Sequence, residues 1–184
     1  ELIEKNPSIA EIYYRLGFVA IQEEDYDAAR DNFDKASILA PSVDKYTKAK
    51  NILAGKILQE ASKAVRMNDM VTAERKTLIS LRINPEFGSA YSLLGYIKLK
   101  SGDTPAAVEN MEKAVMYDPE SRSSWYNLGS TYRKMRQYEK AENALLKAVE
   151  LDPTDSKSFT TLGQTYSAKN DLKKAEENFK KSIA

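Results

Sequence analysis

The stretch that decides the fold of this chain is residues 122–155, RSSWYNLGSTYRKMRQYEKAENALLKAVELDPTD. Its apolar residues recur every three or four positions, first around Leu128 and again around Leu145, which is the spacing of one helical face. Pro153 follows the second pattern, and a proline stops a helix because it has no amide hydrogen and clashes with the preceding turn. The stretch therefore predicts two helices joined by a short turn.

The same pattern recurs along the chain with a period of 34 residues. Five of the six prolines keep this period, with one interval longer by ten residues: Pro7, Pro41, Pro85, Pro119 and Pro153. Four glycines, each preceded by leucine, share the register: Gly17, Gly95, Gly129 and Gly163. A fixed period in this range indicates a solenoid of stacked helix pairs rather than one compact domain.

The glycines in register need a packing reason, because a glycine inside a helix costs about 1 kcal/mol relative to alanine. We expect each one to let the second helix of its pair approach closely. The predicted partners are the alanines twelve residues later: Ala29, Ala107, Ala141 and Ala175.

Short acidic and hydroxyl side chains mark where helices begin. Four aspartates precede the second helix of a pair and are expected to cap it: Asp25, Asp69, Asp103 and Asp171. Ser8 and Glu11 have the spacing of a capping box at the first helix. Pro105 falls in the first turn of its predicted helix, where proline is tolerated.

The clearest copy carries Trp125, Leu128, Gly129, Ala141 and Pro153, and the chain thereby resembles the tetratricopeptide repeat (TPR) family. The resemblance implies an all-α fold, an α-solenoid of antiparallel helix pairs in a right-handed superhelix with about five repeats. The predicted units are 10–43, 44–87, 88–121, 122–155 and 156–184, preceded by a repeat tail at 1–9. The alternative is an unrelated helical bundle that is periodic by coincidence.

The unit at 44–87 departs most from the family pattern. It has Glu60-Ala61 where the family has Leu-Gly, Thr77 at a position for a large apolar residue, and the ten additional residues. We interpret these residues as an N-terminal extension of its first helix. The extension is either tolerated without a role or protrudes as a contact element.

Both ends of the array look incomplete. Residues 1–9 match the tail of a preceding repeat, and the last unit stops before its expected proline. A solenoid without polar capping helices exposes apolar faces. We expect either that the chain is a fragment of a longer solenoid or that a partner covers its ends. That partner could be a second copy of the chain, bound through these ends or through the extended helix.

The resemblance also implies that the first helices line a concave groove that binds a protein or peptide. The candidate groove residues are Tyr14, Phe18, Ile21, Leu58, Tyr96, Tyr126, Asn127, Arg133, Lys134, Lys157 and Gln164. The early ones are mostly apolar and the later ones hydroxyl-bearing or cationic, so a partner with apolar anchors and acidic residues is expected. The alternative for each residue is an ordinary exposed face. Of the family's chaperone-binding residues, only Asn127 and Lys157 match, so that specificity is not expected.

Composition excludes several functions. The chain has no cysteine and no histidine, which removes disulfides, thiol nucleophiles, imidazole ligands and the Ser-His-Asp triad. A net charge of +1 gives no drive toward nucleic acid, and no apolar run is long enough to span a membrane. We expect no metal, no cofactor and no catalysis, and the missing cysteines favour a cytoplasmic location. The predicted function is a non-catalytic scaffold for protein–protein interaction, and the alternative is a regulatory or targeting domain of a larger enzyme.

Overall fold

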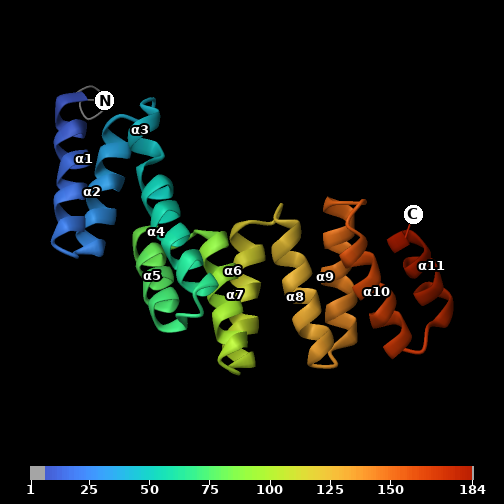
Figure 1. The fold of residues 1–184 in the computed structure, drawn as a ribbon. Coiled ribbons are helices and arrows are strands. Elements are labelled where there is room, and N and C mark those ends of the chain that lie inside the picture. Colours follow the sequence, from blue (N-terminus) through green and yellow to red (C-terminus); the bar gives the residue numbers. More distant parts are fainter. Residues whose placement is uncertain (1–6, 184) are drawn as a thin grey trace. The chain divides into compact units, whose positions relative to one another are not determined.

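The computed structural model describes residues 7–183, and every regular element in that range is an α-helix (Figure 1). The chain divides into two compact units between Ala90 and Tyr91, and each is considered by itself. The first contains α1 (Pro7–Gln22), α2 (Tyr26–Leu39), α3 (Asp44–Thr47), α4 (Ala49–Arg66), α5 (Met70–Ile83) and the start of α6 (Gly88–Lys100). The second contains the rest of α6, α7 (Thr104–Tyr117), α8 (Arg122–Lys134), α9 (Tyr138–Leu151), α10 (Ser156–Ala168) and α11 (Leu172–Ile183). The all-α prediction is confirmed.

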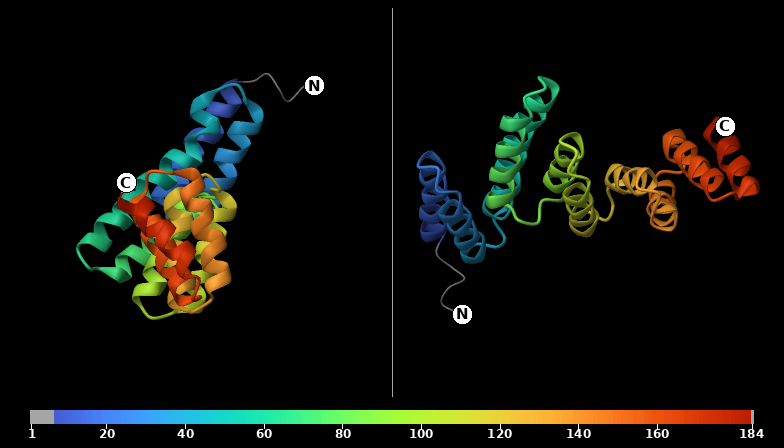
Figure 2. Two further views of the ribbon diagram at one scale, coloured as in Figure 1. Left: turned by 90° about the vertical axis from the view of Figure 1, so that its right-hand side faces the viewer. Right: turned by 90° about the horizontal axis from the view of Figure 1, so that it is seen from below.

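Within each unit, consecutive helices form antiparallel pairs joined by tight turns (Figure 2). Each turn contains one residue with a positive φ, two positions before the second helix. These residues are Glu24, Asn68, Gly102, Arg136 and Asn170. The left-handed conformation reverses the chain within a few residues, at a modest cost for residues other than glycine. The pairs therefore repeat one turn geometry, as a solenoid requires.

The predicted aspartate caps are confirmed. Asp25, Asp69, Asp103 and Asp171 each accept a hydrogen bond from the backbone amide three residues later, over 3.0–3.1 Å. Pro105 lies in the first turn of α7, also as predicted.

The predicted capping box at the first helix is wrong. Helix α1 already begins at Pro7, so Ser8 lies within the helix. The Glu11 carboxylate instead contacts Arg15, Lys45 and Tyr46. Spacing alone could not distinguish a capping box from these side-chain contacts, because two partners of Glu11 lie more than thirty positions away in the sequence.

The four glycines lie where two helices approach closely, but their main neighbour is not the predicted alanine. A Cβ on Gly129 would lie 2.7 Å from Leu145 Cγ, and Ala141 contributes only its carbonyl oxygen at 3.2 Å. The closest residue to all four glycines is the large apolar one sixteen positions later: Phe33, Met111, Leu145 and Phe179. The glycine thus makes room for a bulky side chain, and the alanines are the buried positions beside it.

The additional residues of the 44–87 unit form α3 and the beginning of α4. Lys48 separates the two helices, although hydrogen bonds of helical spacing join Lys48 to Asp44 and to Ile52 on either side of it. Tyr46 of α3 is only 4% exposed and packs on Ala10, Ala36 and Ala40. The start of the extension therefore packs against the α1–α2 pair and does not protrude.

Polar residues at buried positions of α5 have backbone partners. Thr77 donates to the Ala73 carbonyl over 2.7 Å, and Ser80 donates to the Ala54 carbonyl of α4 over 2.9 Å. A buried hydroxyl is tolerated when it forms such a bond. The degenerate repeat thus replaces a large apolar side chain by hydroxyls that bond to its own helix and to its partner helix.

Candidate partner-binding groove

Three candidate residues lie on α1. The Tyr14 ring packs edge-on against Phe18 and Tyr46, at 5.1 and 5.4 Å between centroids, and lies 6.0 Å from Phe33. Tyr14 and Ile21 are half-buried against the core of the first unit, whereas Phe18 keeps 40% of its surface exposed. Of the three, Phe18 presents the largest aromatic surface to a partner.

Charged groups surround this aromatic cluster. Lys45 Nζ lies 5.4 Å from the centre of the Tyr14 ring and 4.8 Å from that of Tyr46, and pairs with the Glu11 carboxylate at 2.6 Å. Bonds from Lys45, Arg15 and Tyr46 lower the pKa of Glu11 from 4.5 to about 2. The carboxylate is therefore ionised across the physiological range.

Leu58 of α4 lines a pocket of 430 Å³ within the first unit. The lining residues are Gly55, Leu58, Gln59, Ser62, Lys63, Arg66, Phe87 and Ser89. A Cβ on Gly55 would meet nothing within 4 Å, so this glycine leaves open space rather than close packing. The pocket combines apolar surface with two cations, Lys63 and Arg66.

Four candidate residues line one pocket in the second unit, with a volume of 420 Å³. Tyr126 and Arg133 come from α8, and Lys157 and Gln164 come from α10. The remaining lining residues are Ser130, Ser156, Thr160, Thr161, Ser182 and Ile183. Residues separated by one repeat in the sequence thus meet on neighbouring first helices.

This pocket is cationic, and none of the described residues that line it carries a side-chain carboxylate. Within residues 7–183, neither Arg133 nor Lys157 forms an ion pair, and Arg133 Nε is buried without a hydrogen-bond partner. Thr160 and Thr161 donate their hydroxyls to backbone carbonyls one turn earlier. Ser182 likewise donates its hydroxyl to the Phe179 carbonyl. The donors left for a ligand include the two cations, the Gln164 amide and the hydroxyls of Ser130 and Ser156. Such a set fits an anionic group.

The remaining three candidates, like those on α1, lie outside both pockets. Tyr96 on α6 is 37% exposed, with the Lys100 ammonium 5.5 Å from its ring centre. Asn127 is half-buried, and its carbonyl accepts a bond from Thr131. Lys134 is exposed at the end of α8.

The position pattern missed several residues of the second pocket. Ser182 and Ile183 come from the second helix of their pair, which the groove positions of the family do not include. Ser156 begins α10 and Thr161 lies one position beyond Thr160. Only the antiparallel course of α10 and α11 brings the end of one helix beside the beginning of the other.

The described part of the chain offers no group of three or more acidic residues that could hold a metal ion. Among the same residues, no helix is both long enough and apolar enough to cross a membrane.

Comparisons with known proteins agree on one family. Models of the tetratricopeptide repeat match residues 10–43, 88–121, 123–155 and 144–177. No curated protein matches the sequence.

Similar solved structures include MamA from Desulfovibrio magneticus RS-1, which is 23% identical over 98% of this chain and 95% of its own, with a TM-score of 0.63. YrrB, described as a TPR protein with an unusual peptide-binding site, is 21% identical over 99% of this chain and 89% of its own, with a TM-score of 0.62. A mutant O-GlcNAc transferase from Thermobaculum terrenum is 26% identical over 70% of this chain but only 26% of its own, with a TM-score of 0.59. The first two likenesses show the fold alone.

Proposed function

Because the chain belongs to the tetratricopeptide repeat family, we propose that it is a non-catalytic scaffold that binds an acidic peptide segment of a partner protein. The observation that carries this proposal is the pocket between α8 and α10, where Arg133 and Lys157 have no ionic partner among the described residues and lie beside the Tyr126 ring. Cations without intramolecular partners are available to a carboxylate, and an aromatic ring provides an anchoring surface.

The partner that fits best has acidic side chains next to apolar ones. In the first unit, Phe18 and the pocket around Leu58 offer apolar surface, and Lys63 and Arg66 add positive charge. In the second unit, the pocket of Arg133 and Lys157 offers mainly cations and hydrogen-bond donors. An extended peptide gains affinity from apolar anchors and orientation from charge pairs.

A random peptide library selected on the full chain tests this proposal. Enriched peptides should combine acidic and apolar residues, and fluorescence anisotropy should show that replacing their acids by amides weakens binding. Arg133→Gln with Lys157→Gln should weaken binding about tenfold or more, because two charge-assisted bonds are lost.

A matched control removes the same charges elsewhere in the second unit. Arg136 and Lys173 are exposed and outside the pocket, so Arg136→Gln with Lys173→Gln should leave peptide affinity within about twofold of the original. Equal loss in both double variants would point to a general charge effect, and no enrichment of acidic peptides would contradict the proposal.

A second candidate is a regulatory or targeting domain of a larger enzyme. The likeness that favours it is the transferase, in which the match spans 26% of a longer chain. The sequence of the full gene product tests it directly, because a catalytic domain in the same chain would support it and its absence would reject it.

A further inference from the structure

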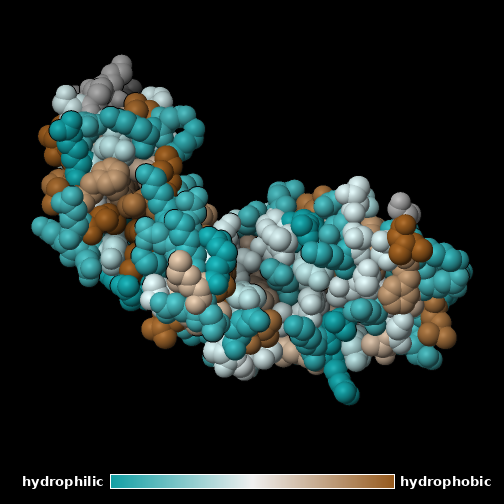
Figure 3. Space-filling view, viewed as in Figure 1, coloured by the Kyte–Doolittle hydropathy of each residue, from teal (hydrophilic) through white to brown (hydrophobic). Residues whose placement is uncertain are grey.

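One face of α1 is apolar and exposed within the described residues. Ile9, Ile12, Leu16 and Val19 lie three or four residues apart and are 41%, 56%, 43% and 46% exposed. This spacing places them on one side of the helix, and we call them the head face. Hydrophobic side chains are visible over the α1–α2 pair in Figure 3. Isolated exposed apolar residues are common, but a continuous stripe marks a contact surface.

The same repeat positions are buried in the second unit. Leu16 corresponds to Leu128 and Leu162, which are 3% and 1% exposed, and Val19 corresponds to Thr131 and Thr165, which are 2% and 0% exposed. In that unit, α8 packs on α7 and α10 packs on α9. The head face is therefore the kind of surface that packs on the second helix of a preceding pair.

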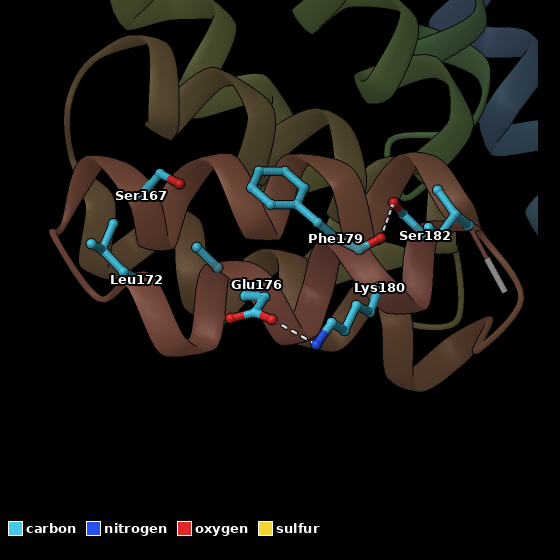
Figure 4. A pocket seen from close by; sticks show the side chains of 8 residues that line it. Ser167, Leu172, Glu176, Phe179, Lys180 and Ser182 are labelled. Atoms are coloured by element: carbon cyan, nitrogen blue, oxygen red, sulfur yellow. Dashed lines mark hydrogen bonds and ion pairs between the residues drawn. The ribbon is translucent and has the colours of Figure 1, made fainter.

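Helix α11 presents the complementary surface. Leu172, Phe179 and Ile183, which we call the tail face, line a pocket of 510 Å³ shown in Figure 4, where Glu176 and Lys180 form an ion pair. Phe179 and Ile183 hold the repeat positions of Leu145 and Val149 on α9. Leu145 and Val149 pack against Leu162 and Tyr166 of α10, whereas Ile183 is 86% exposed.

The two helix pairs that carry these faces have opposite charge. Residues 7–39 contain seven acidic and three basic side chains, and residues 156–183 contain three acidic and six basic ones. Opposite net charges attract two copies before contact and favour this pairing over like with like.

We propose that the head face of one copy binds the tail face of a second copy of this chain. The contact reproduces between chains the packing that α9 and α10 form within one chain. Because the two faces differ, each bound copy keeps one face free, and further copies add to the assembly unless it closes into a ring.

The contact between copies is weaker than its internal counterpart. Within the chain, Tyr166 and Lys169 bond to Glu142 across the α9–α10 packing. The corresponding positions on α1 are Ala20 and Glu23, which provide neither bond. The assembly therefore forms through apolar burial and long-range charge attraction, and is reversible and sensitive to dilution and salt.

Sedimentation equilibrium of the full chain over a wide concentration range tests the proposal. The average mass should rise with concentration beyond that of a dimer and fall when salt is added. Ile12→Glu with Val19→Glu blocks the head face, and Leu172→Glu with Ile183→Glu blocks the tail face. Each double variant should weaken association about tenfold or more, because charges would replace apolar contacts.

Mixing the two blocked variants distinguishes head-to-tail binding from contact between identical faces. Each retains the face that the other lacks, so the mixture should form a one-to-one complex that grows no further. A control variant, Val71→Glu with Met116→Glu, replaces exposed apolar residues elsewhere and should associate like the original. Circular dichroism should show an unchanged helix content in all variants.

A monomer at every concentration, association that survives both blocks, or a mixture that stays monomeric would overturn the proposal. A monomer at every concentration would mean that the head and tail faces bind other helix pairs or a different partner. Ile183 also lines the pocket of Arg133 and Lys157, so Ile183→Glu would affect peptide binding as well. Peptide affinity is therefore compared in the head-blocked variant, whose substitutions lie outside that pocket, and a loss of association there with peptide binding intact separates the two proposals.

Discussion

Tyr166 of α10 donates a hydrogen bond to Glu142 of α9, with 2.9 Å between the phenol oxygen and the carboxylate. Lys169 pairs with the same carboxylate at 2.5 Å. Burial acts to raise the pKa of Glu142, but the bonds from Lys169 and Tyr166 outweigh it and hold that pKa below its ordinary value. Burial and the same carboxylate raise the pKa of Tyr166 to about 12. The packing of these two repeats therefore includes a charged, hydrogen-bonded group beside its apolar core.

Tyr166→Phe should destabilise the second unit by about 1–2 kcal/mol, because it removes a bond to a partly buried carboxylate and keeps the ring. Urea unfolding followed by Trp125 fluorescence measures this, since Trp125 is the one tryptophan and lies in the same unit. Tyr138→Phe removes a hydroxyl with no partner among the described residues and should change stability by less than about 0.5 kcal/mol. Equal effects of both changes would show that the Glu142 bond contributes nothing.

The Glu11 contacts predict a pH-dependent contribution to stability. The pKa of Glu11 is lowered from 4.5 to about 2 by Lys45, Arg15 and Tyr46. A group whose pKa is lower in the folded state stabilises the protein above its unfolded pKa, and this contribution is lost as the pH falls through the folded pKa. In thermal unfolding, Glu11→Gln should therefore lower the midpoint at neutral pH, and the difference from the original should shrink as the pH falls from 4.5 toward 2.

Glu24→Gln is the control for this prediction, because Glu24 is exposed at the α1–α2 turn and its side chain has no partner among the described residues. It should leave the midpoint nearly unchanged at every pH. A midpoint difference for Glu11→Gln that stays constant down to pH 2 would mean that the side chain acts through packing rather than through its charge.

Tyr14 and Phe18 should differ in what they contribute, although both are candidate groove residues. Tyr14 contacts Phe18, Phe33 and Tyr46, so Tyr14→Ala should cost about 2–4 kcal/mol of stability. Phe18→Ala should cost less, about 1–2 kcal/mol, because its ring is 40% exposed. Chemical denaturation of both variants checks the order, and a larger loss for Phe18→Ala would reverse the assignment of Tyr14 to the core.

The helical pairs could be predicted from the sequence because they depend on local signals. The spacing of leucines, the position of Pro153 and the aspartates before the second helices are readable in one dimension. Of the partners of Glu11, Arg15 lies four residues later on the same helix and is readable from spacing. The bonds from Lys45 and Tyr46 of α3 could not be predicted, because these residues meet α1 only after the chain reverses twice and they belong to the unit that departs most from the family pattern.

The candidate groove was predictable in part for the same reason. A periodic rule identifies the positions of successive first helices that lie on the same side of the array, and Tyr126 and Lys157, which it selected, line one pocket. It could not separate Tyr14, which is held by other rings, from Phe18, which is more exposed, because burial depends on the size of neighbours from α2 and α3. Nor could it include Ile183, which reaches the pocket from a second helix.

The close approach at Gly129 allows a last prediction. A methyl group there would lie 2.7 Å from Leu145 Cγ and 3.2 Å from the Ala141 carbonyl. Overpacking costs about 1–3 kcal/mol, and the better helix propensity of alanine recovers about 1 kcal/mol at most. Gly129→Ala should therefore destabilise the chain, by up to about 2 kcal/mol.

Gly55→Ala on α4 is the matched comparison, because a methyl group there meets nothing within 4 Å. With no overpacking to oppose the propensity gain, it should stabilise the chain by about 0.5–1 kcal/mol. The two substitutions are chemically identical and both lie in helices, so their opposite signs in urea unfolding would isolate the effect of close helix packing. A stabilising Gly129→Ala would mean that Leu145 has room to move aside, and that the glycine is not required for the α8–α9 approach.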